Sequence, residues 1–150
     1  MKIYGYWGEL DAPVIMAEVV YERLNIKKFV RFIVDTGSSK TILIDRDLKR
    51  MGIEYSHLQK SDKPSIGIGG AVETYFIPSA KLIFSTDVGT YTEKLKNIYV
   101  LRHEPKNKKD EERIKRIPSL LGRDVLDKYT LVVNKKRGLV VITDEEVRVR

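Results

Sequence analysis

The segment that decides the fold is FIVDTGS at residues 32–38. Its first three residues are apolar, as in a buried strand, and Asp35 follows them directly. A carboxylate in this position is costly to bury unless it is hydrogen-bonded or used in chemistry. Gly37 lets its backbone N–H approach the carboxylate, Ser38 can offer a hydroxyl to an outer carboxylate oxygen, and Thr36 has a hydroxyl that can bond across a partner loop. The same residues are also common in an ordinary turn that leaves a strand.

The pattern on both sides of this segment is mostly of period two, which predicts strands. Asp45 is expected to cap a short helix that Gly52 ends, and the charged residues 102–116 to form a surface loop or a short solvated helix. The length of 150 residues predicts one domain, 1–150. We expect an all-β domain built as a closed or partly closed barrel with little helix. The expected strands cover residues 2–7, 13–21, 28–34, 41–44, 65–77, 81–84, 93–101, 118–121, 130–133 and 139–142.

A second motif, IGIGGA at residues 66–71, lies within the hairpin expected over residues 65–77. Gly69 and Gly70 are expected to form its turn. Glycines at this density cost backbone entropy, so a purely structural hairpin would rarely need three of them. They suit a mobile flap that opens and then offers its backbone N–H groups to a ligand, with an ordinary glycine-rich turn as the alternative that stays open.

A third motif is LLGRDVL at residues 120–126. An apolar pair before Gly122 fits a strand that packs under an active-site loop. Arg123 and Asp124 open the helix expected next, where an acidic side chain suits the positive end of the helix dipole. Taken alone, the motif is also typical of an ordinary junction between a strand and a helix.

Together and in this order, the three motifs resemble those of the retropepsins and their cellular relatives, over roughly residues 13–142. The resemblance implies an all-β, closed-barrel acid-protease fold with one short helix after the Leu-Leu-Gly element. It also implies an aspartic endopeptidase that cleaves a polypeptide substrate as a homodimer. The site residues that it implies are the catalytic Asp35, the active-site loop Thr36, Gly37 and Ser38, the flap Gly67, Ile68, Gly69 and Gly70, and the loop-supporting Leu121, Gly122, Arg123 and Asp124.

The chain departs from the family pattern in several places. Many retroviral members carry acidic residues just after the catalytic loop, where this chain has Ser39 and Lys40. Arg123 must therefore find another partner, and the subsite near Lys40 is expected to prefer different side chains. Residues 102–116 resemble an insertion, and the residues after Val125 resemble those of the cellular members. We expect at least one of the terminal segments to cross the interface of the dimer.

The mechanism that this resemblance implies follows from the number of carboxylates. A single Asp35 cannot act as acid and base at the same moment, but two copies on a two-fold axis can share one proton. The ionised member takes a proton from a water that attacks the scissile carbonyl, and the protonated member stabilises the developing charge on oxygen. This chemistry needs no metal and no organic cofactor.

Other catalytic sites find little support in the sequence. The absence of cysteine excludes a disulfide framework, a thiolate zinc site and a cysteine nucleophile. His57 and His103 are isolated and show neither ligand nor triad spacing, so both are expected to be surface or hydrogen-bonded histidines. A single-chain enzyme with two lobes would need a second loop, and residues 87–90 fail because Ser85 and Thr86 precede them instead of an apolar strand.

The net charge of +7 could indicate nucleic acid or a membrane surface as a partner, but acidic and basic residues are mostly interleaved. No nucleic-acid-reading motif accompanies the charge. The sequence shows no signal peptide and no apolar run long enough to cross a membrane, so we expect a cytoplasmic protein. Two alternatives stay open beside the peptidase: a catalytically idle dimerisation or peptide-binding module, and a basic adaptor for nucleic acid. Intact Asp35, Gly37 and flap glycines favour the peptidase.

Overall fold

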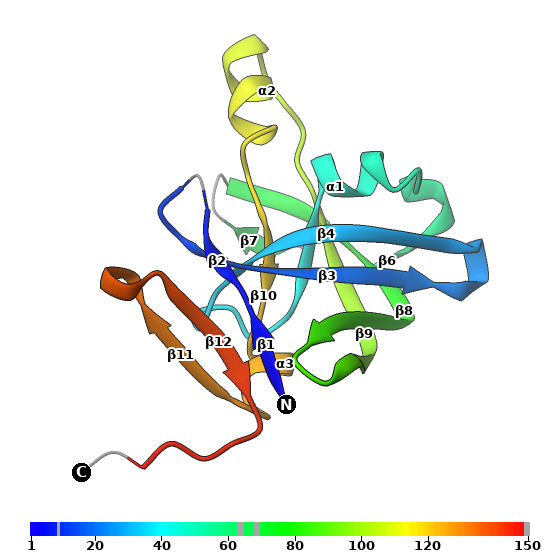
Figure 1. Ribbon diagram of the computed structural model, residues 1–150. Coiled ribbons are helices and arrows are strands. Elements are labelled where there is room, and N and C mark those ends of the chain that lie inside the picture. Colours follow the sequence, from blue (N-terminus) through cyan, green and yellow to red (C-terminus); the bar gives the residue numbers. More distant parts are fainter. Residues whose placement is uncertain (9, 63–64, 68–69, 149–150) are drawn as a thin grey trace.

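The computed structural model describes residues 1–8, 10–62, 65–67 and 70–148 (Figure 1). The strands are β1 (Lys2–Tyr4), β2 (Tyr6–Trp7), β3 (Pro13–Tyr21), β4 (Ile26–Val34), β5 (Ile42–Ile44), β6 (Gln59–Lys60), β7 (Ser65–Gly67), β8 (Gly70–Thr86), β9 (Gly89–Arg102), β10 (Ser119–Leu121), β11 (Thr130–Asn134) and β12 (Leu139–Thr143). The helices are α1 (Asp45–Arg50), α2 (Lys108–Ile114) and α3 (Arg123–Leu126), and short 3-10 turns cover Glu22–Leu24, Tyr55–His57 and Lys135–Arg137.

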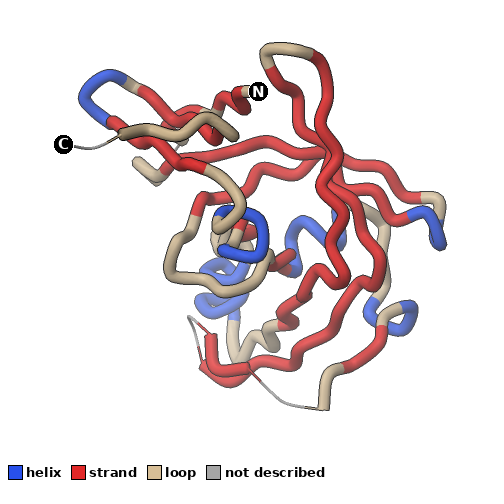
Figure 2. Tube along the Cα trace, turned by 90° about the horizontal axis from the view of Figure 1, so that it is seen from below, coloured by secondary structure: helices blue, strands red, loops and turns tan. Residues whose placement is uncertain are grey.

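Six strands form a closed barrel in the order β3-β4-β10-β5-β9-β8, and β8 pairs back with β3 to complete the ring. The pairs β4–β10 and β5–β9 are parallel, and the other pairs of the ring are antiparallel. Figure 2 shows these strands curving around a common interior. The closed-barrel prediction is therefore confirmed, as is the short helix after the Leu-Leu-Gly element.

Alternation along the strands fills the barrel interior. On β3, Ile15, Ala17 and Val19 are almost completely buried, as the period-two pattern of the sequence predicts. On β4, Phe32 and Val34 belong to the same core, while Ile33 between them is only half-buried. The alternation of β4 therefore directs Asp35, like Ile33, away from the core.

A second sheet lies beside the barrel and joins the two ends of the chain. Its order is β1-β12-β11, and Lys2 of β1 pairs with Thr143 of β12 (Figure 1). The N-terminal segment thus finds a partner strand within its own chain, and residues 144–148 form no strand. Whether either end also crosses a dimer interface stays a prediction.

Several expectations differ in detail from the structure. Asp45 does not cap α1 but is its first residue, because its carboxylate accepts hydrogen bonds from the backbone N–H of the buried His103 and contacts that ring. Gly52 does end this helical segment, in a left-handed conformation. The strands expected at 81–84 and 93–101 are parts of the longer β8 and β9. Within residues 102–116 lies α2, which projects from the barrel at the top of Figure 1.

None of the helices in the described part of the chain is long and apolar enough to cross a membrane.

Candidate active site

Asp35 lies where β4 ends, above the parallel strand β10. Leu121 of β10 pairs with Val34, and its carbonyl accepts the backbone N–H of Asp35 at 3.0 Å. Parallel pairing of two apolar strands thus fixes the backbone on which the carboxylate is carried. The sequence predicted both the apolar strand and the supporting role of Leu121.

One oxygen of the Asp35 carboxylate is held by the loop itself. The backbone N–H of Gly37 donates to Oδ1 at 2.8 Å, which confirms the prediction for this glycine. A Cβ at position 37 would lie 3.1 Å from the same oxygen, a contact tighter than most side chains make. Among the described residues no group bonds to the other oxygen, Oδ2, so it is available to a water, a substrate or a second carboxylate.

The predicted hydrogen bond from the Ser38 hydroxyl to the Asp35 carboxylate is wrong. The hydroxyl donates to the carbonyl of Lys40 at 2.7 Å and not to the Asp35 carboxylate. The reason is local, because the backbone turns at this point, with the N–H of Ser38 donating to the carbonyl of Asp35 at 3.2 Å. Thr36 is exposed, so a role across a partner loop is not tested and stays a prediction.

Gly122 lets two loops cross at close range. A Cβ at this position would lie 2.3 Å from the carbonyl oxygen of Lys40 and 2.9 Å from that of Ser38. The next residue, Arg123, donates its backbone N–H to the carbonyl of Ser38 at 2.8 Å. The position therefore needs glycine because the backbone of residues 38–40 fills the space of a side chain.

Arg123 and Asp124 connect α3 to both sides of the loop 35–38. The guanidinium of Arg123 donates to the carbonyl of Thr36 at 3.0 Å, which supplies the alternative partner that the sequence required. Asp124 accepts the backbone N–H of Thr41 at 2.9 Å and its hydroxyl at 2.7 Å. The same hydroxyl accepts the N–H of Gly122 at 3.1 Å.

Thr41 is therefore a site residue that the sequence reasoning missed. Its side chain is fully buried and joins the residues after the catalytic loop to the start of α3. A threonine before a short apolar strand is a weak signal by itself. Its partner Asp124 lies 83 positions away, so only the topology of the barrel brings the two together.

The predicted flap is the hairpin of β7 and β8, in which Gly67 pairs with Gly70. Ile68 and Gly69 lie outside the described residues, so the predictions for them are not tested. Gly70, expected in the turn, is the first residue of β8.

The base of this hairpin is held by Glu73. Its carboxylate accepts hydrogen bonds from Lys60 at 3.2 Å and Tyr75 at 3.1 Å. These bonds, with Lys60 contributing most, hold the pKa of Glu73 below its ordinary value. Arg102 lies 3.8 Å from the same carboxylate and 4.7 Å from the ring centre of Tyr55. The flap is thus tied to β6 and β9 at its base.

A second buried acid contrasts with Asp35. Glu93 is only 3% exposed, its Oε2 accepts the Tyr129 hydroxyl at 2.7 Å, and its Oε1 contacts the Lys128 ammonium. Both of its oxygens are occupied by protein groups, so it is a structural carboxylate. In the part of the chain that the structure describes, no three His, Asp or Glu side chains gather where a metal ion could be held.

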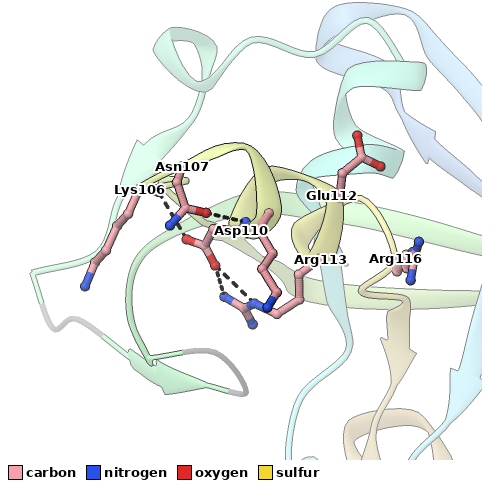
Figure 3. Close-up of a pocket in the computed structure, with 7 residues that line it drawn as sticks. Lys106, Asn107, Asp110, Glu112, Arg113 and Arg116 are labelled. Atoms are coloured by element: carbon pink, nitrogen blue, oxygen red, sulfur yellow. Dashed lines mark hydrogen bonds and ion pairs between the residues drawn. The ribbon is translucent and has the colours of Figure 1, made fainter.

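Charged and polar groups at the start of α2 bond to one another (Figure 3). Asn107 caps the helix by accepting the N–H of Asp110 at 2.8 Å, and the Asp110 carboxylate is bound by Arg113 at 2.7 Å. The bond from Arg113, followed by the backbone N–H of Lys106, lowers the pKa of Asp110. In the view of Figure 3, Lys106 and Arg116 lie on opposite sides of this group. No side chain here resembles a reactive group held ready for a substrate.

Comparisons with known proteins give the family of the chain and one similar fold with a TM-score above 0.5. A family model described as aspartyl protease matches residues 20–125. A search of curated proteins finds no match. Among solved structures, a retropepsin-like aspartic protease from Rickettsia conorii has a TM-score of 0.57 at 17% identity and covers 94% of this chain and 98% of its own. The EIAV protease in complex with an inhibitor has a TM-score of 0.47 at 16% identity, covering 77% and 86% of the two chains. The retroviral protease-like domain of Ddi1 from Leishmania major has a TM-score of 0.48 at 14% identity, covering 89% and 98%.

Proposed function

This chain belongs to the aspartyl protease family, and we propose that it is an endopeptidase that works as a homodimer with one Asp35 from each protomer at a shared active site. The observation that carries the proposal is the state of the Asp35 carboxylate. Its Oδ1 is fixed by the N–H of Gly37 at 2.8 Å, and its Oδ2 has no partner among the described residues. A single carboxylate of this kind can serve as the acid or as the base of the reaction, but not as both at once, so it is one half of the acid–base pair that hydrolysis needs.

The second half must come from another chain. In the described residues no other carboxylate bonds to the 35–38 loop, and the other Asp-x-Gly segment, 87–90, is a hairpin turn. A two-fold axis beside Asp35 would bring two identical carboxylates together. Because two adjacent negative charges repel, the pair would hold a single proton and titrate as a unit.

Hydrolysis then needs only this pair and a water. The ionised carboxylate removes a proton from the water as it attacks the scissile carbonyl, and the protonated carboxylate donates a hydrogen bond to the developing oxyanion. The proton taken from the water is later passed to the leaving amine, which restores the singly protonated pair. No further reactant is required.

The remaining site residues position the pair and enclose the substrate. Thr36 is exposed beside Asp35, so in a dimer its hydroxyl could bond to the matching loop of the partner. Leu121, Gly122 and the pair of Arg123 and Asp124 hold the loop from below through the bonds described above. The flap residues Gly67, Ile68, Gly69 and Gly70 would close over the substrate and exclude bulk water.

The stoichiometry of an inhibitor tests the proposal. A peptide with a hydroxyl-bearing carbon in place of the scissile carbonyl imitates the tetrahedral intermediate and should bind between two Asp35 side chains. Calorimetric titration should give one inhibitor for every two chains, and Asp35→Asn should abolish tight binding. One inhibitor per chain would reject the shared site. A dimer that binds peptides but neither binds this inhibitor nor cleaves anything would instead be the idle peptide-binding module.

A further inference from the structure

A groove of about 780 Å³ follows the outer face of β3 and β4, beyond the residues described so far. Two directly opposed pairs of these strands line it, Val14 with Ile33 and Met16 with Arg31. Tyr6 and Pro118 extend the apolar floor on either side. Met16 and Tyr6 are each 41% exposed, so this apolar surface is left uncovered by the chain itself.

The lining of the groove includes Ile33, two positions before Asp35 in the chain. Side chains alternate along a strand, so Arg31 and Ile33 belong to the same face of β4, and Asp35, the first residue after the strand, continues this alternation. At about 3.3 Å per residue, Ile33 lies roughly 7 Å and Arg31 roughly 13 Å along the strand from Asp35. An extended peptide whose scissile bond reaches Asp35 could therefore lay its neighbouring residues in this groove.

The rim of the groove is basic. It carries Arg31, Arg46, Lys115 and Arg116, and no acidic side chain is among the described residues that line it. Arg46 and Lys115 are only weakly engaged, 4.0 Å from Asp47 and 3.7 Å from Glu112. Arg31 and Arg116 form no ion pair within the part of the chain that the structure describes.

The segment before β10 supplies half of this charge. Lys115 and Arg116 follow directly after α2, within the residues that the sequence indicated as an insertion. The turn after α2 brings them to the groove, beside Arg46 of α1, whose guanidinium lies 3.5 Å from the carbonyl of Lys115. Figure 1 shows α2 leading into β10 next to the β2 end of the molecule.

We propose that this groove selects the substrate: it binds peptides with an apolar residue beside the scissile bond and an acidic residue about four positions further out. The inference rests on the proposed function, since it uses Asp35 as the origin of the spacing. The apolar floor nearest Asp35 accepts the first residue, and the unpaired Arg31 with Arg116 accepts the second. A homodimer contains the groove twice, so an acidic residue on either side of the scissile bond would be selected.

A second basic hollow makes a useful contrast. It is lined by Lys40, Lys94 and Lys96, together with Asp124 and Lys128, and holds about 350 Å³. Its lining lacks the run of exposed apolar side chains that the groove offers. It therefore supplies control variants with the same change of charge.

The test uses three twelve-residue peptides that are identical except for a Glu, Gln or Lys placed four residues from a central pair of leucines. Fluorescence anisotropy measures their affinity for the uncleaving Asp35→Asn protein, and mass spectrometry measures their cleavage by the wild type. The Glu peptide should bind about fivefold more tightly than the Gln peptide at low ionic strength, with the Lys peptide weakest. Arg31→Glu combined with Arg116→Glu should reverse the order, while Lys94→Glu combined with Lys96→Glu should leave it unchanged.

Equal affinities for the three peptides, or an order that changes in the lysine variant and not in the arginine variant, would overturn the inference. If the doubly substituted protein does not fold, Arg31→Gln alone, checked by thermal melting, should halve the preference for Glu. Cleavage of all three peptides with equal affinity would keep the proposed function and reject this inference. Preferential binding of the Glu peptide without any cleavage by the wild type would reject the proposed function and keep the preference of the groove for acidic peptides.

Discussion

The loop 35–38 and the turn 87–90 both place a glycine two residues after an aspartate, but their carboxylates are used differently. Asp35 bonds to Gly37 within its own loop and keeps one oxygen free among the described residues. Asp87 instead accepts the N–H of Lys2 at 2.7 Å and returns its own N–H to the Lys2 carbonyl, so it fastens β1 to the barrel. The residues before the aspartate, and not the aspartate and glycine themselves, separate a candidate catalytic loop from a structural turn.

The supports of the two segments differ in the same way. The loop 35–38 rests on β10 and α3, which come from a part of the chain more than 80 residues away. The turn 87–90 is closed by its own hairpin, where the Thr86 hydroxyl donates to the carbonyl of Gly89 at 2.9 Å, and its distant bonds are those between Asp87 and Lys2. Gly89 has φ of +119° and open space around it, whereas Gly122 is packed against the backbone of Lys40. The first loop is therefore held by strands and a helix that are distant in the chain, whereas the second is closed mainly by bonds within its own hairpin.

The largest expected effect is on activity and separates the two aspartates. Asp35→Asn should lower the rate of peptide cleavage by roughly a thousandfold or more, because the pair then lacks an ionisable base. Asp87→Asn changes an equivalent side chain in the other segment and should keep near-normal turnover per folded dimer. Both are measured with a peptide library read by mass spectrometry, with circular dichroism as the folding control. Loss of turnover in the Asp87 variant alone would reverse the assignment.

The second effect is on stability and compares the two glycines. Gly122→Ala forces the backbone of Lys40 to move, so the free energy of unfolding should fall by about 3 kcal/mol. Gly89→Ala meets no neighbour and should cost only about 1 kcal/mol for its positive φ. Urea unfolding measures both. Activity per folded protein should drop for Gly122→Ala alone, and equal losses in stability would show that the crossing of the two loops is not tight.

The third comparison concerns two threonine hydroxyls. Thr41→Val removes a buried hydroxyl that bonds to Asp124 and to Gly122, which should cost about 2 kcal/mol because the partners are left unsatisfied. Thr86→Val removes an exposed turn hydroxyl, whose partners can bond to water, and should cost about 0.5 kcal/mol. Thermal melting distinguishes them. A cost for Thr86→Val equal to that for Thr41→Val would contradict the account of a distant, buried support.

Much of the contrast between the loop 35–38 and the turn 87–90 could be predicted from the sequence, because it depends on residues that are close together in the chain. The apolar run before Asp35, the alternation of β3 and the Gly-rich hairpin each indicate their own structure within a few residues. The order of the three motifs then indicated the barrel. The rejection of residues 87–90 as a second catalytic loop followed from Ser85 and Thr86 before them, from the lack of a second Leu-Leu-Gly element and from the length of the chain. The structure places residues 87–90 at the turn of a hairpin.

What the sequence could not supply are contacts between distant residues and choices among competing hydrogen bonds. The bonds from Thr41 to Asp124 depend on the neighbouring placement of β5 and β10. Ser38 had two acceptors within reach, and the turn of the backbone favoured the Lys40 carbonyl. Asp45 likewise binds His103, 58 positions away, in place of a local cap.

The smallest expected effect extends the comparison to the base of the flap. The bonds from Lys60 and Tyr75 lower the pKa of Glu73, so its contribution to stability is present above the ordinary carboxylate range and is lost as pH falls through the lowered pKa. The melting temperature of the wild type should therefore exceed that of Glu73→Gln near neutral pH, and the two should converge once the pH falls below the lowered pKa of Glu73. Added salt should shrink the difference, because these groups are exposed. A difference in melting temperature that grows on acidification would contradict the stabilising role of the ionised Glu73 carboxylate.

The central claim is that two Asp35 side chains from two chains form one site, and mixing tests it most directly. Wild-type protein and Asp35→Asn are unfolded together, refolded at a fixed total concentration well above the dimer dissociation constant, and assayed for cleavage. A mixed dimer has a single ionisable Asp35 at its site, so activity should follow the square of the wild-type fraction and fall to about a quarter in an equal mixture. A fall to about half would mean that each chain works alone, and that result would contradict the account.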